Sequence, residues 1–424
     1  MNWRQRYYFT SYVRSSLWIV PFVAIPLELV VTRLAHWADA SLGWTLLGFA
    51  TSGAQATLQA IVTATLSFVV FTFGSLLVAI QVAGGQLTSR IIATTLLRDN
   101  VVKYTVGLFI FTLLFALSAQ DRVDTKVHQL VLFLAASLGL LSFAAFFYLI
   151  DYASRLLRPI SILARVGQAG LAVIENVYPE QSRGAQVADV PRAALGPPDR
   201  VIPHHGTSGI VLAANVEALV AAAERCDGTI EFVPQVGDFV AVDEPLFNLY
   251  GKASALDDDE LRSAVALGSE RTMEQDPTFA FRIVIDIALR ALSSAINDPT
   301  TAVLALDQLH RLLRMVGKRH LRTDEIVDKS GRLRVIFRTP NWEDFVHLAF
   351  SETRDCGSGN LQVARRLRAM LENLLLTLPE HRHPALREEL TLLDREIEKR
   401  FPYPEVLALA RVGDSQGLGG HSSR

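Results

Sequence analysis

The residues best suited to carry chemistry lie between positions 271 and 298 of the 424-residue chain. Arg282, Asp286 and Arg290 are four residues apart, so they share one face of a helix. The rest of that helix is largely apolar, and a charged stripe on an otherwise buried helix needs partners. The arginine–aspartate cluster, as we call it, consists of Arg271, Asp276, Arg282, Asp286, Arg290, Asn297 and Asp298.

Two interpretations of the arginine–aspartate cluster are open. Arginine side chains beside a capped helix start could bind an anionic ligand or a nucleotide. The same residues could form an internal ion-pair network or a subunit contact, because structural ion pairs imitate binding sites. An open pocket containing Arg282, Asp286 and Asp298 would favour ligand binding.

Two Asp-Pro pairs predict the helices that carry this cluster. Asp at the N-cap followed by Pro at the first helical position is a strong start signal. Asp276 therefore predicts a helix that runs to Ile296, and Asp298 predicts a helix that runs to Val316.

Signatures of known enzymes are missing from the sequence. There is no Walker loop, no GxGxxG after a strand, no GxSxG and no HExxH. Cys226 and Cys356 fit small buried side chains, and no stripe of basic and aromatic residues indicates nucleic acid. We therefore expect no catalytic residue, no cofactor, no metal site and no nucleic-acid partner.

Apolar residues are concentrated in the first 150 positions of the chain. A bilayer core of about 30 Å requires about 20 apolar residues in a helix. Because backbone polar groups in lipid need internal partners, such segments must be helical. Four segments are long enough, at about 17–35, 58–83, 101–119 and 130–150. They predict a four-helix transmembrane bundle.

The distribution of Lys and Arg predicts the orientation of these spans. Arg4 and Arg6 precede the first span, residues 36–57 contain no Lys or Arg, and Arg155 and Arg158 follow the fourth span. Positive residues are enriched on the cytoplasmic side. We expect a multi-pass protein of the bacterial inner membrane with both termini in the cytoplasm.

Polar residues inside the spans are the second candidate site. Glu28 lies in the first span, where a carboxylate costs about 2.5–3.5 kcal/mol on insertion scales. It either faces an ion or proton path, or lies near the outer interface and pairs with Arg33.

The second span carries two polar stripes, one of them extending from Thr65 to Gln86 and the other from Ser67 to Gly85. Small and hydroxyl residues serve helix packing, yet one stripe could also face water. The candidate pore-lining residues are Glu28, Thr65, Thr72, Ser75 and Gln86.

The remaining chain predicts a cytoplasmic α+β region. We expect a transmembrane domain over 1–158, a linker over 159–200, a small β-rich, barrel-like module over 201–255 and a mainly helical module over 256–412. The strand and turn pattern of the β-rich module looks similar to half of a lipoyl-like barrel-sandwich, without its carrier lysine. The Gly- and Ser-rich tail over 413–424 predicts disorder.

The chain resembles the predicted bacterial membrane proteins of the domain-of-unknown-function 2254 family. The resemblance depends on residues 14–18 (RSSLW), 86–90 (QLTSR), 271–277 (RTMEQDP) and 291–302 (ALSSAINDPTTA). It extends over nearly the whole chain and implies a membrane topology, but no activity.

These observations favour an oligomeric channel- or transporter-like protein with a regulatory cytoplasmic domain. Four spans are too few to enclose a wide path, so a homo-oligomer is expected. The alternatives are a non-conducting membrane-anchored sensor or scaffold, and a membrane-bound enzyme or ligand-binding protein that uses the arginine–aspartate cluster. The expected partners are the lipid bilayer, further copies of the chain, and a small ion or anionic ligand.

Overall fold

The computed structural model describes residues 2–42, 48, 50–86, 99–123, 127–156, 158–181, 195–321 and 324–420. The chain divides into two compact units. We call Ser11–Ile162 the bundle unit, and Met1–Thr10 together with Leu163–Arg424 the mixed unit.

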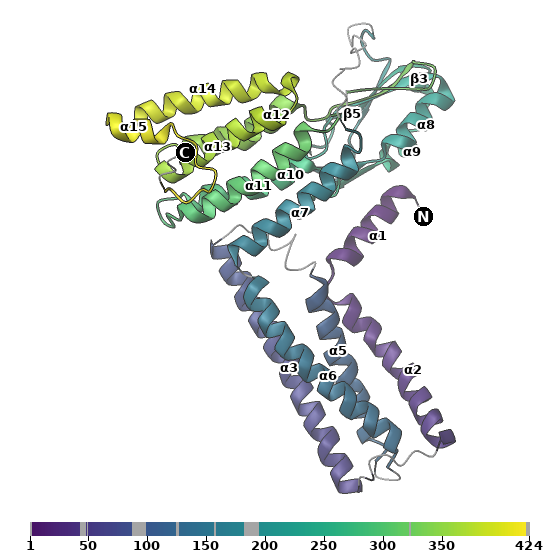
Figure 1. Cartoon of the computed structure of the whole chain (residues 1–424). Coiled ribbons are helices and arrows are strands. Elements are labelled where there is room, and N and C mark those ends of the chain that lie inside the picture. The colour runs from purple at the N-terminus through teal and green to yellow at the C-terminus, as the bar shows by residue number, and fades with distance from the viewer. Residues whose placement is uncertain are drawn as a thin grey trace. The chain divides into compact units, whose positions relative to one another are not determined.

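Four long helices form the bundle unit (Figure 1). They are α2 (Ile19–Leu42), α3 (Thr51–Gln86), α5 (Asn100–Gln120) and α6 (Gln129–Leu156). Each is long and apolar enough to cross a membrane. They coincide with the four expected spans, and α5 packs against the other three.

Aromatic side chains fill the interior of the bundle unit. The rings of Phe68 and Phe146 are stacked at 4.3 Å between centroids, and Phe109 beside them is fully buried. Large apolar side chains such as Leu77 and Leu140 are exposed on the outside. An apolar exterior around a packed interior is the arrangement that a lipid environment requires.

A fifth helix, α7 (Pro159–Val177), also has the length and composition to cross a membrane. From Leu163 onward, however, α7 belongs to the mixed unit, and its Ile174 is fully buried there. A Cβ at Gly170 would meet the side chains of Ala280 and Leu312 at 2.9 Å. The first half of the expected linker is therefore a helix that packs against α10 and α11.

The N-terminal helix α1 (Trp3–Ser15) begins in the mixed unit. The Tyr8 hydroxyl donates to the Leu267 carbonyl at 2.6 Å and accepts from the Leu267 amide at 2.9 Å. Trp3 and Tyr7 pack against a small apolar cluster formed by Leu212, Ala213 and Ala266. Segments more than 250 residues apart in sequence therefore lie side by side.

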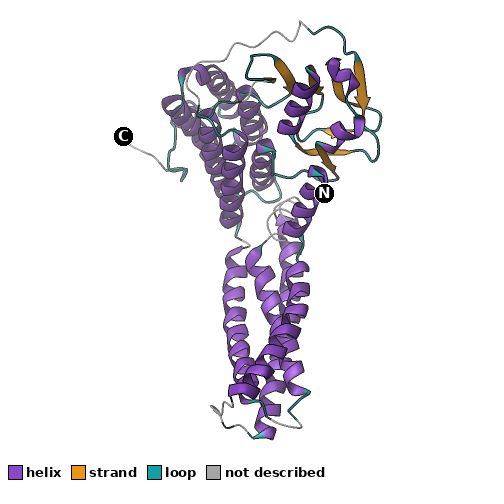
Figure 2. Cartoon of the chain, turned by 90° about the vertical axis from the view of Figure 1, so that its right-hand side faces the viewer, coloured by secondary structure: helices purple, strands orange, loops and turns teal. Residues whose placement is uncertain are grey.

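The strands of the mixed unit form two sheets (Figure 2). The five-stranded sheet has the order β1 (Arg200–Pro203), β5 (Pro245–Gly251), β3 (Gly228–Phe232), β8 (Leu333–Phe337) and β7 (Glu325–Val327). Its neighbours are antiparallel except β3 and β8, which are parallel. The three-stranded sheet has the order β4 (Phe239–Val240), β2 (Gly209–Ala214) and β6 (Val265–Gly268).

The expected barrel-like module over 201–255 is not confirmed, because β6, β7 and β8 join the sheets from later parts of the chain. A shared core of Ile230, Phe232, Phe247 and Val335 closes this region. It is covered by α8 (Val216–Cys226), with η3 (Lys252–Ala255) and α9 (Asp258–Ser263) beside it.

Packed helices make up the rest of the mixed unit, drawn green to yellow in Figure 1. They are α10 (Pro277–Ala291), α11 (Pro299–Gly317), α12 (Trp342–Gly357), α13 (Leu361–Thr377), η4 (Glu380–Arg382), α14 (His383–Arg400) and α15 (Pro404–Ala410). The aromatic rings of Phe281 on α10 and Phe345 on α12 meet in their core at 5.3 Å.

The segment 413–420 folds back on α13 instead of showing the disorder expected from its composition. Arg365 is fully buried and donates from Nε to the Val412 carbonyl at 3.0 Å and from Nη1 to the Gly420 carbonyl at 2.8 Å. The Asp414 carboxylate accepts from the Gly419 amide at 2.7 Å. Buried hydrogen bonds therefore order a segment that has few apolar side chains. Residues 421–424 lie outside the described part.

Candidate functional site

Arg271 and Asp276 form the first network of the arginine–aspartate cluster. Asp276 is the N-cap of α10, as expected, and its Oδ1 accepts from the Phe279 amide at 3.1 Å. Its Oδ2 accepts from Arg271 Nε at 3.0 Å, and the Arg271 guanidinium lies over the Phe279 ring. The guanidinium also fills the space beside Gly237, whose φ of +96° and missing side chain permit this approach.

Arg282 and Asp286 form a second network with a partner on α12. Arg282 pairs with Asp286 at 2.5 Å and donates from Nη2 to Glu352 at 3.0 Å. The hydrogen bond to Glu352 raises the pKa of Arg282, and the same bond lowers the pKa of Glu352. Arg282, which also pairs with Asp286 on its own helix, therefore joins α10 to α12 through its ion pair with Glu352. Arg290 lies further along α10.

Asn297 and Asp298 form a third, separate feature. Asp298 is the N-cap of α11, as expected, and accepts from the Thr301 amide at 3.1 Å and the Thr301 hydroxyl at 2.6 Å. Asn297 has a φ of +49°, a left-handed conformation that asparagine tolerates. Helix α10 ends at Ala291 rather than at Ile296, and this turn connects it to α11. The cluster is thus divided among a cap network, an interhelical ion pair and a turn.

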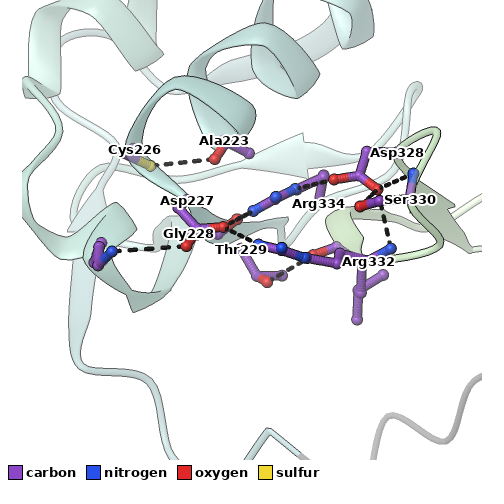
Figure 3. A network of polar contacts seen from close by, with 11 residues as sticks. Ala223, Cys226, Asp227, Gly228, Thr229, Asp328, Ser330, Arg332 and Arg334 are labelled. Atoms are coloured by element: carbon purple, nitrogen blue, oxygen red, sulfur yellow. Dashed lines mark hydrogen bonds and ion pairs between the residues drawn. The ribbon is translucent and has the colours of Figure 1, made fainter.

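A further charged network, at the end of α8, was not found from the sequence (Figure 3). Asp227 accepts from Arg332 at 2.8 Å and from Arg334 at 3.0 Å, while Asp328 accepts from Arg334 Nε at 2.8 Å. The hydrogen bond from Arg334 lowers the pKa of Asp227, and the hydrogen bond from Ser330 lowers that of Asp328. These bonds tie the β7–β8 hairpin to α8.

The candidate pore-lining residues of α3 are divided between two faces. Thr65 is 1% exposed and Thr72 is 4% exposed, so both face the interior of the bundle unit. Ser75 is exposed, and its hydroxyl donates to the Thr72 carbonyl at 3.0 Å. The side chain of Gln86 lies outside the described part of the chain.

The opposite stripe of α3 is not covered by the rest of the bundle unit. Ser67, Gly74 and Gln81 are all exposed, and a Cβ at Gly74 would meet nothing within 4 Å. The Ser67 hydroxyl donates to the Thr63 carbonyl of the same helix at 2.8 Å, so its hydrogen already has an acceptor. A polar carboxamide at Gln81 remains on an otherwise apolar surface.

Glu28 lies inside the bundle unit. It is 2% exposed, and its Oε1 accepts from the Thr32 hydroxyl at 2.7 Å. Arg33 is exposed, and no ion pair between it and Glu28 is present. The structure therefore places the carboxyl in the protein interior, away from Arg33.

A buried lysine near one end of the bundle was also missed by sequence reasoning. Lys103 is 5% exposed and lines a cavity of about 10 Å³ together with Thr72, whose hydroxyl oxygen is buried without a hydrogen-bond partner. At the same end, the Tyr152 hydroxyl donates to Asp99, the N-cap of α5. Only the run of apolar neighbours around Lys103 hinted at its burial.

This combination of apolar helices with buried polar groups and a separate mixed unit defines a multi-pass α-helical membrane protein. The chain belongs to the DUF2254 family of predicted membrane proteins, which it matches over residues 14–373. The family suspected from the sequence motifs is thus confirmed.

Two mycobacterial proteins are similar over most of the chain. They are the uncharacterized proteins Mb1321c of Mycobacterium bovis and Rv1290c of Mycobacterium tuberculosis. Each is 25% identical over 413 residues, which cover 92% of this chain and 78% of the relative. No solved structure matches the chain.

Proposed function

We propose that the chain is an oligomeric, channel- or transporter-like protein of the bacterial inner membrane, regulated by its mixed unit. The observation that carries this proposal is the uncovered stripe of α3. Ser67, Gly74 and Gln81 face outward from the protomer within a membrane-crossing helix. Polar groups in a bilayer normally face protein or water, and small residues allow helices to approach closely.

Self-association explains this stripe better than lipid contact does. The cavity beside Lys103 holds only about 10 Å³, room for one water molecule and not for a continuous path. A second copy packed on α3 would cover Gly74 and give the Gln81 carboxamide a polar environment. If the conduction path runs between protomers, Gln81 and Ser75 would then lie close enough to line it.

A four-span topology with both termini in the cytoplasm is part of this proposal. Tyr8 and Leu267 are hydrogen-bonded in one folded unit, and the four helices of the bundle unit lie between them in sequence. Two segments that fold together must be on the same side of the membrane, which favours an even number of crossings. Arg4 and Arg6 beside Tyr8 favour the cytoplasmic side.

A non-conducting membrane-anchored scaffold is the second candidate. The burial of Thr65 and Thr72 favours it, because side chains that face the interior of one protomer cannot line a path between protomers. A ligand site in the arginine–aspartate cluster has less support, since Arg271 and Arg282 are engaged by carboxylates of the chain itself.

Cysteine cross-linking tests the assembly. With Cys226 and Cys356 replaced by serine, Gly74→Cys should form a disulfide-linked dimer in native membranes under mild oxidation. Leu140→Cys is the matched control, because Leu140 is 73% exposed on the lipid-facing side of α6. Equal cross-linking at both positions would show random collision and exclude an α3 interface.

Solute flux through proteoliposomes separates the channel from the scaffold. A positively charged, water-soluble thiol reagent should reduce ion flux in the Gln81→Cys variant and leave the Leu140→Cys variant unchanged. A cross-linked α3 dimer that carries no flux under any ion gradient would favour the scaffold.

A further inference from the structure

Glu28 occupies the middle of a membrane-crossing helix. It is the tenth residue of the 24-residue helix α2, which places its Cα about 4 Å from the helix midpoint at a rise of 1.5 Å per residue. The side chain is 2% exposed, and its hydrogen-bond donor is the neutral Thr32 hydroxyl. A carboxylate at this depth requires a cation, water or a proton.

The helices that surround Glu28 offer it no nearby cation. Helix α3 contains no ionisable residue. On α5 and α6, the ionisable side chains lie near the end where Tyr152 bonds Asp99: Lys103, Tyr104, Tyr148, Asp151, Tyr152 and Arg155. At the opposite end, beyond the helices, the charged residues are Asp121 and Arg122, together with Asp124 and Lys126 outside the described part. On α2 itself, Arg33 is exposed.

His36 lies about two turns after Glu28 on the same helix, and Thr32 between them contacts both side chains. The Thr32 carbonyl, which can only accept, lies 2.7 Å from His36 Nδ1, so that nitrogen carries the hydrogen. In the neutral ring, Nε2 is then an unprotonated acceptor. It is buried and has no hydrogen-bond partner. A basic nitrogen held in this state can take up a proton.

A second histidine, at the start of α6, faces His36. His128 Nδ1 lies 2.7 Å from the Asp39 carboxylate, whose other oxygen accepts from the Leu130 amide at 2.8 Å. The centroids of the two imidazole rings are 4.9 Å apart. Both rings line a cavity of about 10 Å³, which fits one water molecule between proton-binding groups.

We propose that Glu28 is a proton-binding carboxyl in the membrane and that the His36–His128 pair exchanges protons with the aqueous phase at its end of the bundle. Uptake transfers a proton from a hydronium ion to the carboxylate: an O–H bond of the hydronium ion breaks and leaves a water molecule, and an O–H bond of a neutral carboxylic acid forms, which still accepts from Thr32. The Asp39 carboxylate holds His128 in one orientation, because it contacts His128 Nδ1 and is itself fixed by the Leu130 amide. This inference deepens the proposed transport function by naming the proton as the ion that is carried or coupled.

The geometry favours a proton over a metal ion. Within the described ranges, no three His, Cys, Asp or Glu side chains are arranged to hold a metal. Both Asp39 oxygens are already engaged, and Glu28 is eight residues before His36, about 12 Å along the helix. Calorimetric binding of Zn²⁺ that is lost in His36→Gln would overturn the proton assignment.

Infrared difference spectroscopy tests the site without relying on transport. The full chain in lipid nanodiscs should show a carboxylic-acid carbonyl band that changes when the pH is lowered, and Glu28→Gln should remove it. Asp151→Asn is the matched control, because Asp151 is an exposed carboxylate on α6 and should leave the band unchanged. A band that persists in Glu28→Gln, while circular dichroism shows a folded variant, would refute the assignment.

Proton flux into proteoliposomes then tests the coupled role. Glu28→Gln should abolish flux driven by a pH gradient, whereas His36→Gln should reduce it and shift its pH profile. If the infrared band depends on Glu28 and flux is absent in the unmodified protein, the proton site stands and the proposed transport function fails.

Discussion

Asp276 and Asp298 provide a matched test of whether the arginine–aspartate cluster is structural. Each is an N-cap directly before a proline, and each accepts from a backbone amide three residues later at 3.1 Å. Only Asp276 also binds a cation, with Arg271 at 2.8 Å. Replacement by serine keeps a capping oxygen and removes the negative charge, so it separates the two contributions.

The expected losses of unfolding free energy follow from these contacts. Serine caps about as well as aspartate, so Asp298→Ser should cost less than about 0.5 kcal/mol, and Asp298→Ala about 1 kcal/mol. Asp276→Ser removes a charge-assisted hydrogen bond, which contributes about 1.5–3 kcal/mol. Because the Arg271 side chain is 35% exposed, we expect the lower value, about 1.5 kcal/mol. Asp276→Ala should cost about 2.5 kcal/mol, since the cap is lost as well.

Denaturant unfolding of the full chain in detergent micelles would measure these differences. The order of stability should be Asp298→Ser, then Asp298→Ala, then Asp276→Ser, then Asp276→Ala. If Asp298→Ser is as destabilising as Asp276→Ser, the Asp298 carboxylate has a charged partner and the capping interpretation is refuted.

Three further perturbations test other contacts of the mixed unit. Tyr8→Phe removes both hydrogen bonds to Leu267, so amide hydrogen exchange at Leu267 should accelerate by about fivefold, the equivalent of about 1 kcal/mol. Arg365→Met should make residues 413–420 sensitive to limited proteolysis while leaving α13 protected, because the buried guanidinium holds the carbonyls of Gly419 and Gly420 in that segment and of Val412 directly before it. Burial lowers the pKa of His310, whose Nδ1 accepts from Arg366, so the unfolded chain binds the proton more tightly. Stability should therefore fall as the pH drops below about 6.5, and less so in His310→Gln, as unfolding at several pH values would show.

Local signals were the ones that could be interpreted correctly from the sequence. The caps at Asp276 and Asp298 and the presence of long apolar helices in the first part of the chain depend only on residues a few positions apart. The α7 segment shows the limit of this reasoning. Its composition suits a membrane span, yet its apolar face packs on helices that follow it by more than a hundred residues.

Contacts between residues far apart in the chain could not be predicted from the sequence. Arg282 shows an obvious pair with Asp286, but its second carboxylate, Glu352, is 70 residues away. Strand β8 pairs with β3 although it lies about a hundred residues later in the chain. The hydrophobic pattern of either segment alone does not show that the two strands pair. The opposition of His36 and His128 depends on how α2 and α6 pack, so neither histidine stood out alone.

The pairing of Tyr8 with Leu267 has a consequence for how the protein is synthesised. The first ten residues leave the ribosome long before strand β6, their binding surface, has been made. All four hydrophobic segments of the bundle must pass the insertion machinery while this N-terminal helix is still without its partner. During translation Trp3 and Tyr7 therefore lack the apolar cluster that they contact in the folded chain. A large tag fused ahead of Trp3 should slow maturation more than the same tag placed after residue 420.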